Sequence, residues 1–406
     1  MVSWANSEIG GIIKAAQDYA AKKAPAESRE NLTRFIGQFY AGGPPEDLKG
    51  RSPETLYNAA AAAWETMQSR QPGTVKVRIV QGKGAGAPDR TALIVVNDDM
   101  PFLVDSVICE MERMEETPLL AIHPIVTVNR DAAGKLLGLA DSDGNSSSGA
   151  GRITESVMHV EFSEQTDPDQ LDRIKDNITS VLNDVRLAVR DWAAMRRHAG
   201  RLAADFDGPG PGVDAAQAEE AADFLRWLHD DHYTFIGYRR YAFESRAGKT
   251  VANIDRDQSL GVLIKQQIGI FEGLSDGGEV PAKFNDYLKR EAVLLIVKAN
   301  QRATVHRRVH YDVVAIKIFD AAGKVIGVHM FVGLFTADVY TNSPSFVPVL
   351  RRKIERIRAS VGFQKHSHDG KLLEIREFRP TSAQPGDTTT LVSRRGALGM
   401  PYYAQR

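Results

Sequence analysis

The start of the chain carries hydrophobic residues at a period near 3.6, which is typical of amphipathic helices. The recurring positions are Ile9, Ile12, Ile13, Ala16, Tyr19, Leu32, Phe35, Ile36 and Phe39. An alanine-rich stretch over residues 52–67 continues the pattern, and alanine has the highest helix propensity of all residues. The pattern predicts a helical lead-in over residues 1–72.

The period changes to two after this lead-in, which indicates strands. Val75, Val77 and Ile79 alternate with polar residues, and a β-branched run follows at 91–96 after a glycine-rich turn. Two such runs on either side of a turn predict a β-hairpin.

A helix is predicted directly after the hairpin, in the stretch NDDMPFLVDSVICEMERMEE. Phe102, Val107 and Met111 share one apolar face there. Either Asp98 or Asp99 can act as the N-cap, because an aspartate side chain accepts hydrogen bonds from the first amides of a helix. The second strand thus leads into the helix through an acidic turn.

The rest of the first half repeats the order of strands followed by a helix. The stretches LLAIHPIVTV and ESVMHVEF predict strands, with the loop DSDGNSSSGAG between them. A helical rhythm runs from residue 169 to 204 and ends before GPGPG, whose glycines and prolines break the chain. We therefore predict a domain over 73–205 and a linker over 206–213. The helices of the domain over 73–205 are expected to cover one face of a largely antiparallel sheet, which makes a two-layer α/β sandwich.

A second domain with an antiparallel sheet is predicted over residues 214–373. It opens with the amphipathic stretch AAQAEEAADFLRWLHDD and continues with the strand YTFIGYRRYAF. AVLLIVKA, HYDVVAIKIFD and KVIGVHMFVGLF predict further strands, and Gly323 can take the positive φ that a hairpin turn between the last two needs. Residues 345–362 return to helix with a solvated basic face. The chain as a whole is expected to be of the α+β class.

Composition narrows the classes of partner and compartment. The 406 residues are 43% hydrophobic, enough for more than one buried core, and 51 Lys and Arg balance 52 Asp and Glu. The chain therefore lacks the excess of positive charge that would attract nucleic acid or an anionic membrane. No run of about 18 apolar residues and no signal-peptide pattern occur, which favours the cytoplasm. The single cysteine, Cys109, excludes an internal disulfide, suits a reducing compartment and is expected to be a buried thiol on the apolar helix face.

Motifs for catalysis are not recognisable in the sequence. GKGAG at 82–86 lacks the spacing of a dinucleotide loop and lies between two strands rather than opening a helix. His306 and His310 fall in a predicted strand entry, about 13 Å apart, which is too far for one metal ion. His366 and His368 have only Asp369 as an obvious third ligand. We predict no catalytic, cofactor-binding or metal site in this chain.

Several long segments occur in the order found in one bacterial enzyme family. The segments are NDDMPFLVDSV, AIHPIVTVNRDAAGKL, ESVMHVEF, VLNDVRLAVRDWAAM, DFLRWLHDDHYTFIGYRRY, VHRRVHYDVVAIK and VGLFTADVY. Over residues 30–373 the chain resembles the N-terminal region of the bacterial large NAD-specific glutamate dehydrogenases. The resemblance implies that 73–205 is an ACT-like domain and 214–373 a PAS-like domain, with the catalytic domain in a distant C-terminal part.

The resemblance also implies a non-catalytic region that regulates and assembles its parent enzyme. The parent reaction converts L-glutamate, NAD and water to 2-oxoglutarate, ammonium and NADH, so NAD is expected for the parent and no cofactor for this chain, which is expected to be inactive alone. The expected partners are the rest of the dehydrogenase and neighbouring subunits of a homo-oligomer. Two alternatives stay open: a purely architectural spacer, and a free-standing sensor of a small molecule such as an amino acid.

The acidic turn is the candidate effector site, because ACT-like domains generally bind small effectors near the loop between the first strand and helix. The residues are Asn97, Asp98, Asp99, Met100, Phe102 and Asp105. Carboxylates suit the ammonium group of an amino acid, and amides at a helix start suit its carboxylate. The structural alternatives are an N-cap for one aspartate and an ion pair of Asp105 with an arginine.

The end of the chain departs from the family pattern. After HSHDGKLL a further helix is expected, whereas residues 374–406 are dominated by Pro, Gly, Ser, Thr and Arg. We predict a flexible terminus there or, alternatively, a reading frame that is truncated or frameshifted from about Glu374.

Overall fold

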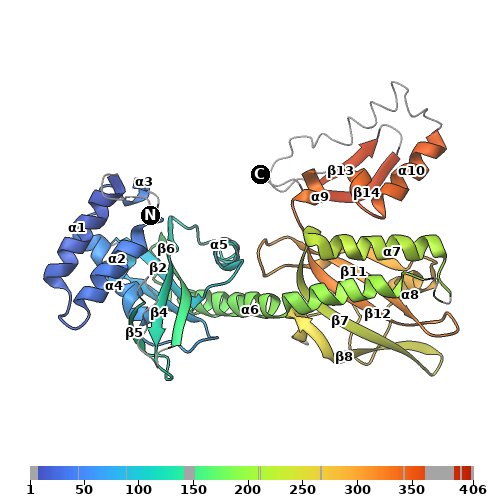
Figure 1. Cartoon of the computed structure of the whole chain (residues 1–406), viewed down its shortest axis with the longest axis horizontal. Coiled ribbons are helices and arrows are strands. Elements are labelled where there is room, and N and C mark those ends of the chain that lie inside the picture. Colours follow the sequence, from blue (N-terminus) through green and yellow to red (C-terminus); the bar gives the residue numbers. More distant parts are fainter. Residues whose placement is uncertain are drawn as a thin grey trace. The chain divides into compact units, whose positions relative to one another are not determined.

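The computed structural model describes residues 8–43, 45–87, 89–140, 151–208, 210, 212–265, 268–341, 343–361, 388–393 and 396–403. The chain divides into two compact units. Unit 1 comprises Met1–Arg186 with Thr304–Arg308, and unit 2 comprises Leu187–Ala303 with Val309–Arg406. Each unit contains helices and an antiparallel sheet, which confirms the predicted α+β class (Figure 1).

Four helices precede the first sheet, as the hydrophobic pattern predicts. They are α1 Glu8–Lys23, α2 Arg29–Tyr40, α3 Pro45–Leu48 and α4 Pro53–Met67. The start of α4 is fixed by Ser52, whose hydroxyl accepts a hydrogen bond from the Thr55 amide at 3.1 Å, with a proline in the first turn. The rings of Phe35 and Trp64 pack 5.4 Å apart and join α2 to α4.

The first sheet has six strands. They are β1 Lys76–Gln81, β2 Arg90–Asp98, β3 Leu120–Ile122, β4 Ile125–Arg130, β5 Leu136–Leu139 and β6 Gly151–Ser163. Their order is β1-β2-β6-β4-β5, β3 also pairs with β6, and every pair is antiparallel. β1 and β2 form the predicted hairpin, in which Lys76 lies opposite Val96.

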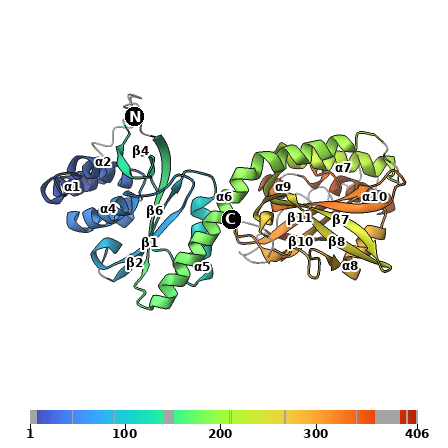
Figure 2. The same cartoon turned by 90° about the horizontal axis from the view of Figure 1, so that it is seen from below.

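Helices cover both faces of this sheet. The lead-in helices α1, α2 and α4 lie on one face, and α5 Leu103–Arg113 with the first part of α6 Pro168–Asp205 lie on the other (Figures 1 and 2). Residues 91–97 of β2 are consequently all buried. Phe35 and Phe39 share one core with Ile94 and Val96. The lead-in helices therefore add a third layer to the predicted two-layer sandwich.

Unit 2 is built on a second six-stranded sheet. The strands are β7 Tyr233–Arg246, β8 Lys249–Gly261, β9 Gly278–Glu279, β10 Leu294–Arg302, β11 His310–Phe319 and β12 Val325–Phe335. The order is β10-β11-β12-β7-β8-β9, again antiparallel throughout. The β11–β12 hairpin turns at Gly323 with φ 79°, as predicted. β8 and β9 have no counterpart among the predicted elements.

The helices of unit 2 are α7 Ala215–Trp227, α8 Ala282–Lys289, α9 Asp338–Thr341 and α10 Leu350–Val361. Residues from the last part of α6, from α7 and from the sheet form one core, among them Met195, Phe224, Phe235 and Phe331. α6 is 38 residues long and supplies apolar residues to the cores of both units. The units therefore divide within α6, whereas residues 206–213 separate α6 from α7 inside unit 2.

Part of the predicted tail forms two strands, β13 Thr388–Ser393 and β14 Gly396–Tyr403, which pair in antiparallel fashion. The rest of 374–406 lies outside the described residues, as do the predicted loop 141–150, His366 and His368. Among the residues that the structure describes, no helix has the length and apolar character that crossing a membrane requires.

Candidate functional site

The predicted effector residues lie in unit 1 where β2 ends and α5 begins. Asn97 and Asp98 end the strand, and Phe102 directly precedes the helix. Phe102 occupies the N-cap position in a left-handed conformation, φ 70°, and its side chain makes no capping hydrogen bond. The prediction that Asp98 or Asp99 caps α5 is therefore wrong, because the strand continues through Asp98 and the turn places Phe102 at the helix start.

Two arginines and a backbone amide hold Asp98. Arg70 Nη2 donates to its Oδ1 at 2.8 Å, while Arg186 Nη1 and the Gly73 amide donate to Oδ2 at 2.5 and 2.9 Å. Burial opposes ionisation, but the donors Arg186 and Arg70 outweigh it and hold the pKa of Asp98 below its ordinary value. Asp98 is thus an ionised structural anchor with both carboxylate oxygens engaged.

The neighbouring residues of the turn differ in exposure. Asn97 is fully buried, and its Oδ1 accepts a hydrogen bond from Arg186 Nη2. Asp99 is exposed, and its amide donates to the Thr154 carbonyl at 3.1 Å. Met100 is half-buried. Asp99 is therefore a carboxylate of the turn that solvent can reach.

Asp105 pairs with a histidine rather than with an arginine. His306 Nδ1 lies 2.8 Å from Asp105 Oδ2, the His306 amide donates to Ser106 Oγ at 2.9 Å, and the His306 ring lies 5.0 Å from the Phe102 ring. His306 has φ 66° and lies before β11, which begins at His310. The prediction that both histidines lie on one face of a strand is wrong, because the left-handed bend at His306 keeps it out of the strand.

The turn is therefore a centre of ion pairs in which Asp99 remains accessible beside Phe102. The sequence could place these residues together because they are consecutive, but it could not reveal Arg70, Arg186 and His306 as their partners. Effector binding at the turn stays a prediction.

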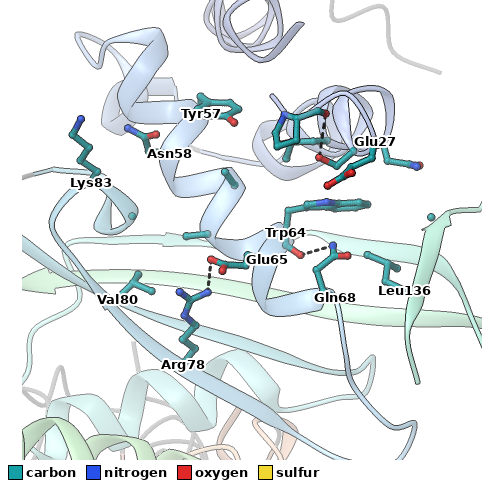
Figure 3. A pocket seen from close by; sticks show the side chains of 18 of the residues that line it. Glu27, Tyr57, Asn58, Trp64, Glu65, Gln68, Arg78, Val80, Lys83 and Leu136 are labelled. Atoms are coloured by element: carbon teal, nitrogen blue, oxygen red, sulfur yellow. Dashed lines mark hydrogen bonds and ion pairs between the residues drawn. The ribbon is translucent and has the colours of Figure 1, made fainter. Parts of the chain in front are cut away.

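An open groove of about 1140 Å³ runs over α4 in unit 1 (Figure 3). Tyr57 and Trp64 of α4 line it together with residues of α2, β1 and β5. Arg78 Nη1 donates to Glu65 Oε2 at 2.7 Å, and Gln68 Nε2 donates to the Trp64 carbonyl at 3.0 Å. Both hydrogen bonds join residues that line the groove.

A smaller cavity of about 400 Å³ lies in unit 2, against β7, β8 and the loop 262–276. Its apolar lining is Ile254, Leu263, Ile264, Ile268 and Leu274. Its charged lining is Arg239, Arg256 and Asp276. This volume is in the range of small-ligand pockets, and an apolar lining with few charged groups is typical of them. The sequence does not predict this cavity, because only the folded chain brings Arg239 together with the lining residues between 254 and 276.

A partly buried polar chain of two histidines and a tyrosine joins α6, β7 and β12 in unit 2. His198 Nε2 lies 2.8 Å from the Tyr238 hydroxyl, which lies 2.7 Å from His329 Nδ1. Burial, assisted by Arg201, lowers the pKa of His198 to about 4. Burial, assisted by His198 and Arg240, lowers the pKa of His329 to about 3. Both imidazoles are therefore neutral hydrogen-bonding groups near neutral pH.

Cys109 is half-buried rather than fully buried, which corrects the sequence-based expectation. Burial raises the pKa of its thiol, so the reactive thiolate is disfavoured near neutral pH. Within the described ranges, no group of three or more His, Cys, Asp and Glu side chains is placed to hold a metal ion.

Two family models match this chain. The ACT1 domain of glutamate dehydrogenase matches residues 35–178, which begins inside α2 and ends inside α6. Helical motif 1 of glutamate dehydrogenase matches residues 347–376, which includes α10.

Curated relatives agree with these matches. The NAD-specific glutamate dehydrogenase of Halomonas elongata is 30% identical over 374 residues, 91% of this chain and 23% of that protein. The NAD-specific glutamate dehydrogenase of Pseudomonas aeruginosa is 28% identical over 353 residues, 86% of this chain and 21% of that protein. The NAD-specific glutamate dehydrogenase of Mycobacterium tuberculosis is 25% identical over 283 residues, 70% of this chain and 16% of that protein. The chain thus spans less than a quarter of the length of these relatives.

Proposed function

Because the chain belongs to the N-terminal region of the NAD-specific glutamate dehydrogenase family, we propose that it is a non-catalytic part of such an enzyme that serves regulation and subunit assembly. The observation that carries the proposal is the extent of the match. The chain aligns over 91% of its own length with a relative of which it covers only 23%, and its family matches fall on an ACT1 domain and a helical motif.

The proposed parent reaction is the oxidative deamination of L-glutamate to 2-oxoglutarate and ammonium with NAD. The NAD site of the parent enzyme is proposed to lie outside these 406 residues. The chain would then influence the reaction only by shifting the equilibrium between conformations or assembly states of the whole enzyme. Its proposed partners are the rest of the dehydrogenase and identical neighbouring subunits, and its proposed location is the cytoplasm.

The geometry of unit 1 favours a regulatory role over a simple spacer. A spacer needs only a stable core, whereas the turn presents the exposed Asp99 carboxylate and the half-buried Phe102 beside Asp98, which Arg70 and Arg186 hold in place. Such a frame can hold a ligand without reorganising, which lowers the entropic cost of binding. We therefore retain this turn as the proposed effector site.

Assembly is tested by sedimentation of the purified chain over a range of concentrations. The proposal expects a concentration-dependent shift from monomer to a defined oligomer. A chain that stays monomeric at hundreds of micromolar, while the longer enzyme is oligomeric, would remove assembly from its functions and leave regulation alone.

A further inference from the structure

A short segment of unit 1 runs along one side of helix α5. Residues 304–308 follow β10 and precede β11 in the sequence, and they contain neither helix nor strand. The His306 amide donates to Ser106 Oγ at 2.9 Å, and Arg308 Nη1 donates to Glu110 Oε2 at 3.2 Å. Residues four apart on a helix lie on the same side of it, so the segment follows α5 from Ser106 to Glu110. We call residues 304–308 the α5 strap.

The side of α5 beneath the strap is polar and buried. Ser106 is 1% exposed and Glu110 is 4% exposed. Another side of the helix carries Leu103, Val107 and Met111, which are buried as well. A helix that packs on one face of a sheet normally leaves its polar side in water. Because α5 buries two sides, the strap is a cover over the second one and supplies hydrogen-bond donors to its polar groups.

His306 of the strap occupies two residues of the predicted effector turn. Its Nδ1 lies 2.8 Å from Asp105 Oδ2, and its ring lies 5.0 Å from the ring of Phe102. Phe102 and Asp105 are both among the residues that the sequence predicts for effector binding. A ligand that contacts both side chains must therefore compete with the imidazole of His306.

The first part of the strap is firmly anchored. Thr304 Oγ1 donates to Asp184 Oδ2 at 2.8 Å, and Val305 is fully buried. Burial removes the apolar surface of Val305 from water, which stabilises the attachment. The Ala303 amide donates to the Val309 carbonyl at 2.7 Å, so a backbone hydrogen bond closes the base of the strap. These contacts hold the strap at its base and leave the tip, residues 306–308, as the part that can move.

The tip is attached by weaker contacts than the base. The side chains of His306 and Asp105 are 28% and 55% exposed, and ion pairs at such positions contribute little to stability. His306 also has a left-handed φ of 66°, a conformation that is strained for a residue other than glycine. Movement of the tip away from α5 would relieve this strain. Segments with few buried contacts open more often than the core of a protein does.

The tip also covers the thiol of Cys109, which lies between Ser106 and Glu110 on α5. A backbone hydrogen bond joins Arg308 to this thiol, which is half-buried. Cys109 is the only cysteine in the chain. The access of reagents to Cys109 therefore reports the position of the tip.

We propose that residues 306–308 form a gate that opens and closes over Phe102, Asp105 and Cys109. In the closed state His306 fills the place beside Phe102 and Asp105, and a ligand reaches both residues only after the gate opens. This inference deepens the proposed effector turn and rests on it for the presence of a ligand. The gate itself is measured without any ligand, so the two proposals can fail separately.

Alkylation of Cys109 by iodoacetamide measures the gate in the complete 406-residue chain. Mass spectrometry of samples taken over time gives the rate, and the single cysteine makes the modified site unambiguous. Opening of the tip limits the access of the reagent, so variants that weaken the closed state are expected to react faster.

Arg308→Gln is the most informative variant, because charge and gating predict opposite effects. Burial raises the pKa of the Cys109 thiol, and Arg308 opposes this shift through its backbone and its positive charge. Removal of the charge alone would make the reactive thiolate scarcer and slow the reaction. Loss of the contact to Glu110 loosens the tip instead, and we expect alkylation to be faster by about fivefold or more.

Arg113→Gln is the matched control. Arg113 donates to the same Glu110 carboxylate, and its side chain is 36% exposed, compared with 31% for Arg308. Arg113 belongs to α5 and not to the strap. Its substitution is expected to leave the alkylation rate within about twofold of the wild-type rate.

His306→Gly tests the gate at a second contact. It removes the ion pair to Asp105 and the ring contact to Phe102, while glycine adopts the positive φ at this position without strain. Alkylation is again expected to be faster by about fivefold or more. Urea unfolding of each variant gives its global stability, and the expected acceleration exceeds the change in the population of unfolded chain.

Three results would overturn the gate. Alkylation of Arg308→Gln or His306→Gly at or below the wild-type rate would show that the tip does not control access to Cys109. Equal acceleration in Arg308→Gln and Arg113→Gln would assign the effect to Glu110 rather than to the strap. An acceleration that the loss of global stability explains in full would replace local opening by unfolding of the chain.

Discussion

Arg130 and Glu155 form a bidentate ion pair in the middle of unit 1, with both side chains fully buried. Arg130 Nε donates to Glu155 Oε1 at 2.7 Å and Nη2 donates to Oε2 at 2.8 Å. Arg70 donates to the same carboxylate through Nε at 3.0 Å and Nη2 at 2.6 Å. Because Arg70 also binds Asp98, this buried cluster fixes the frame on which the proposed effector turn stands.

Replacing Glu155 by glutamine is expected to destabilise unit 1 by about 3–5 kcal/mol, because it leaves two buried arginines short of a counter-ion. Urea-induced unfolding followed by circular dichroism measures the change. Glu65→Gln is the matched control, since Glu65 pairs with Arg78 at the surface with 67% of its side chain exposed, and such pairs contribute less than about 1 kcal/mol. Equal effects of the two substitutions would contradict a structural role of the buried cluster.

Gly134 holds this cluster in place from the turn between β4 and β5. Its carbonyl accepts from Arg130 Nη1 at 2.8 Å, it has φ 79°, and a Cβ there would lie 2.6 Å from the Arg70 carbonyl oxygen. Gly134→Ala is expected to lower the free energy of unfolding by about 1–3 kcal/mol more than Gly50→Ala does, because the backbone of Arg70 must move. Gly50 has φ 81° with no atom within 4 Å of its Cβ position, so its variant measures the conformational strain alone.

Acid stability follows from the His198–Tyr238–His329 chain. The unfolded chain protonates histidine at a pKa near 6.5, whereas the folded pKa is about 4 for His198 and about 3 for His329. The stabilising contribution of the two histidines to the free energy of unfolding is therefore fully present above pH 6.5. It is lost as the pH falls from 6.5 towards 3. His329→Gln removes one of these two contributions, so its unfolding temperature is expected to fall less steeply over this range. Identical slopes for variant and wild type would rule out the assigned pKa shift of His329.

The effector turn is tested by a thermal-shift screen of the common L-amino acids. A saturable rise in the unfolding temperature is expected with at least one of them, and Asp99→Asn is expected to abolish it while leaving the unliganded unfolding temperature within about 2 °C, because Asp99 is exposed. Glu112→Gln, at an exposed position of α5, is the control. An undiminished response in Asp99→Asn would exclude the turn as the site.

Much of the fold could be predicted because its elements have clear periodicity. The helical rhythm at 169–204 corresponds to α6, which spans Pro168–Asp205, and the alternation of Val75, Val77 and Ile79 corresponds to β1. β8 is not predicted because its sequence, with Asp255, Arg256 and Asp257, lacks an apolar alternation. It becomes a strand through pairing with β7, a long-range effect that local pattern does not contain.

The site could be predicted only as far as neighbouring residues define it. The acidic turn makes Asp98 a candidate, yet its ion-pair partners lie 28 and 88 residues away in sequence. Arg239 shows the same limit: in YTFIGYRRYAF it reads as one of two strand arginines, and only the folded loop after β8 buries it. Ion-pair and hydrogen-bond partners depend on the tertiary structure. Sequence patterns therefore indicate candidate residues but not the contacts that define their roles.

Glutamate-dependent reduction of NAD shows directly whether these residues form a non-catalytic region. The purified 406-residue chain is assayed beside a longer product that includes the remaining family domains, with L-glutamate omitted as the blank. We expect NADH formation by the longer product and none above the blank by this chain at equal molar concentration. Sustained NADH formation by the 406-residue chain would contradict the assignment of these residues to a non-catalytic region and require a dinucleotide site within them.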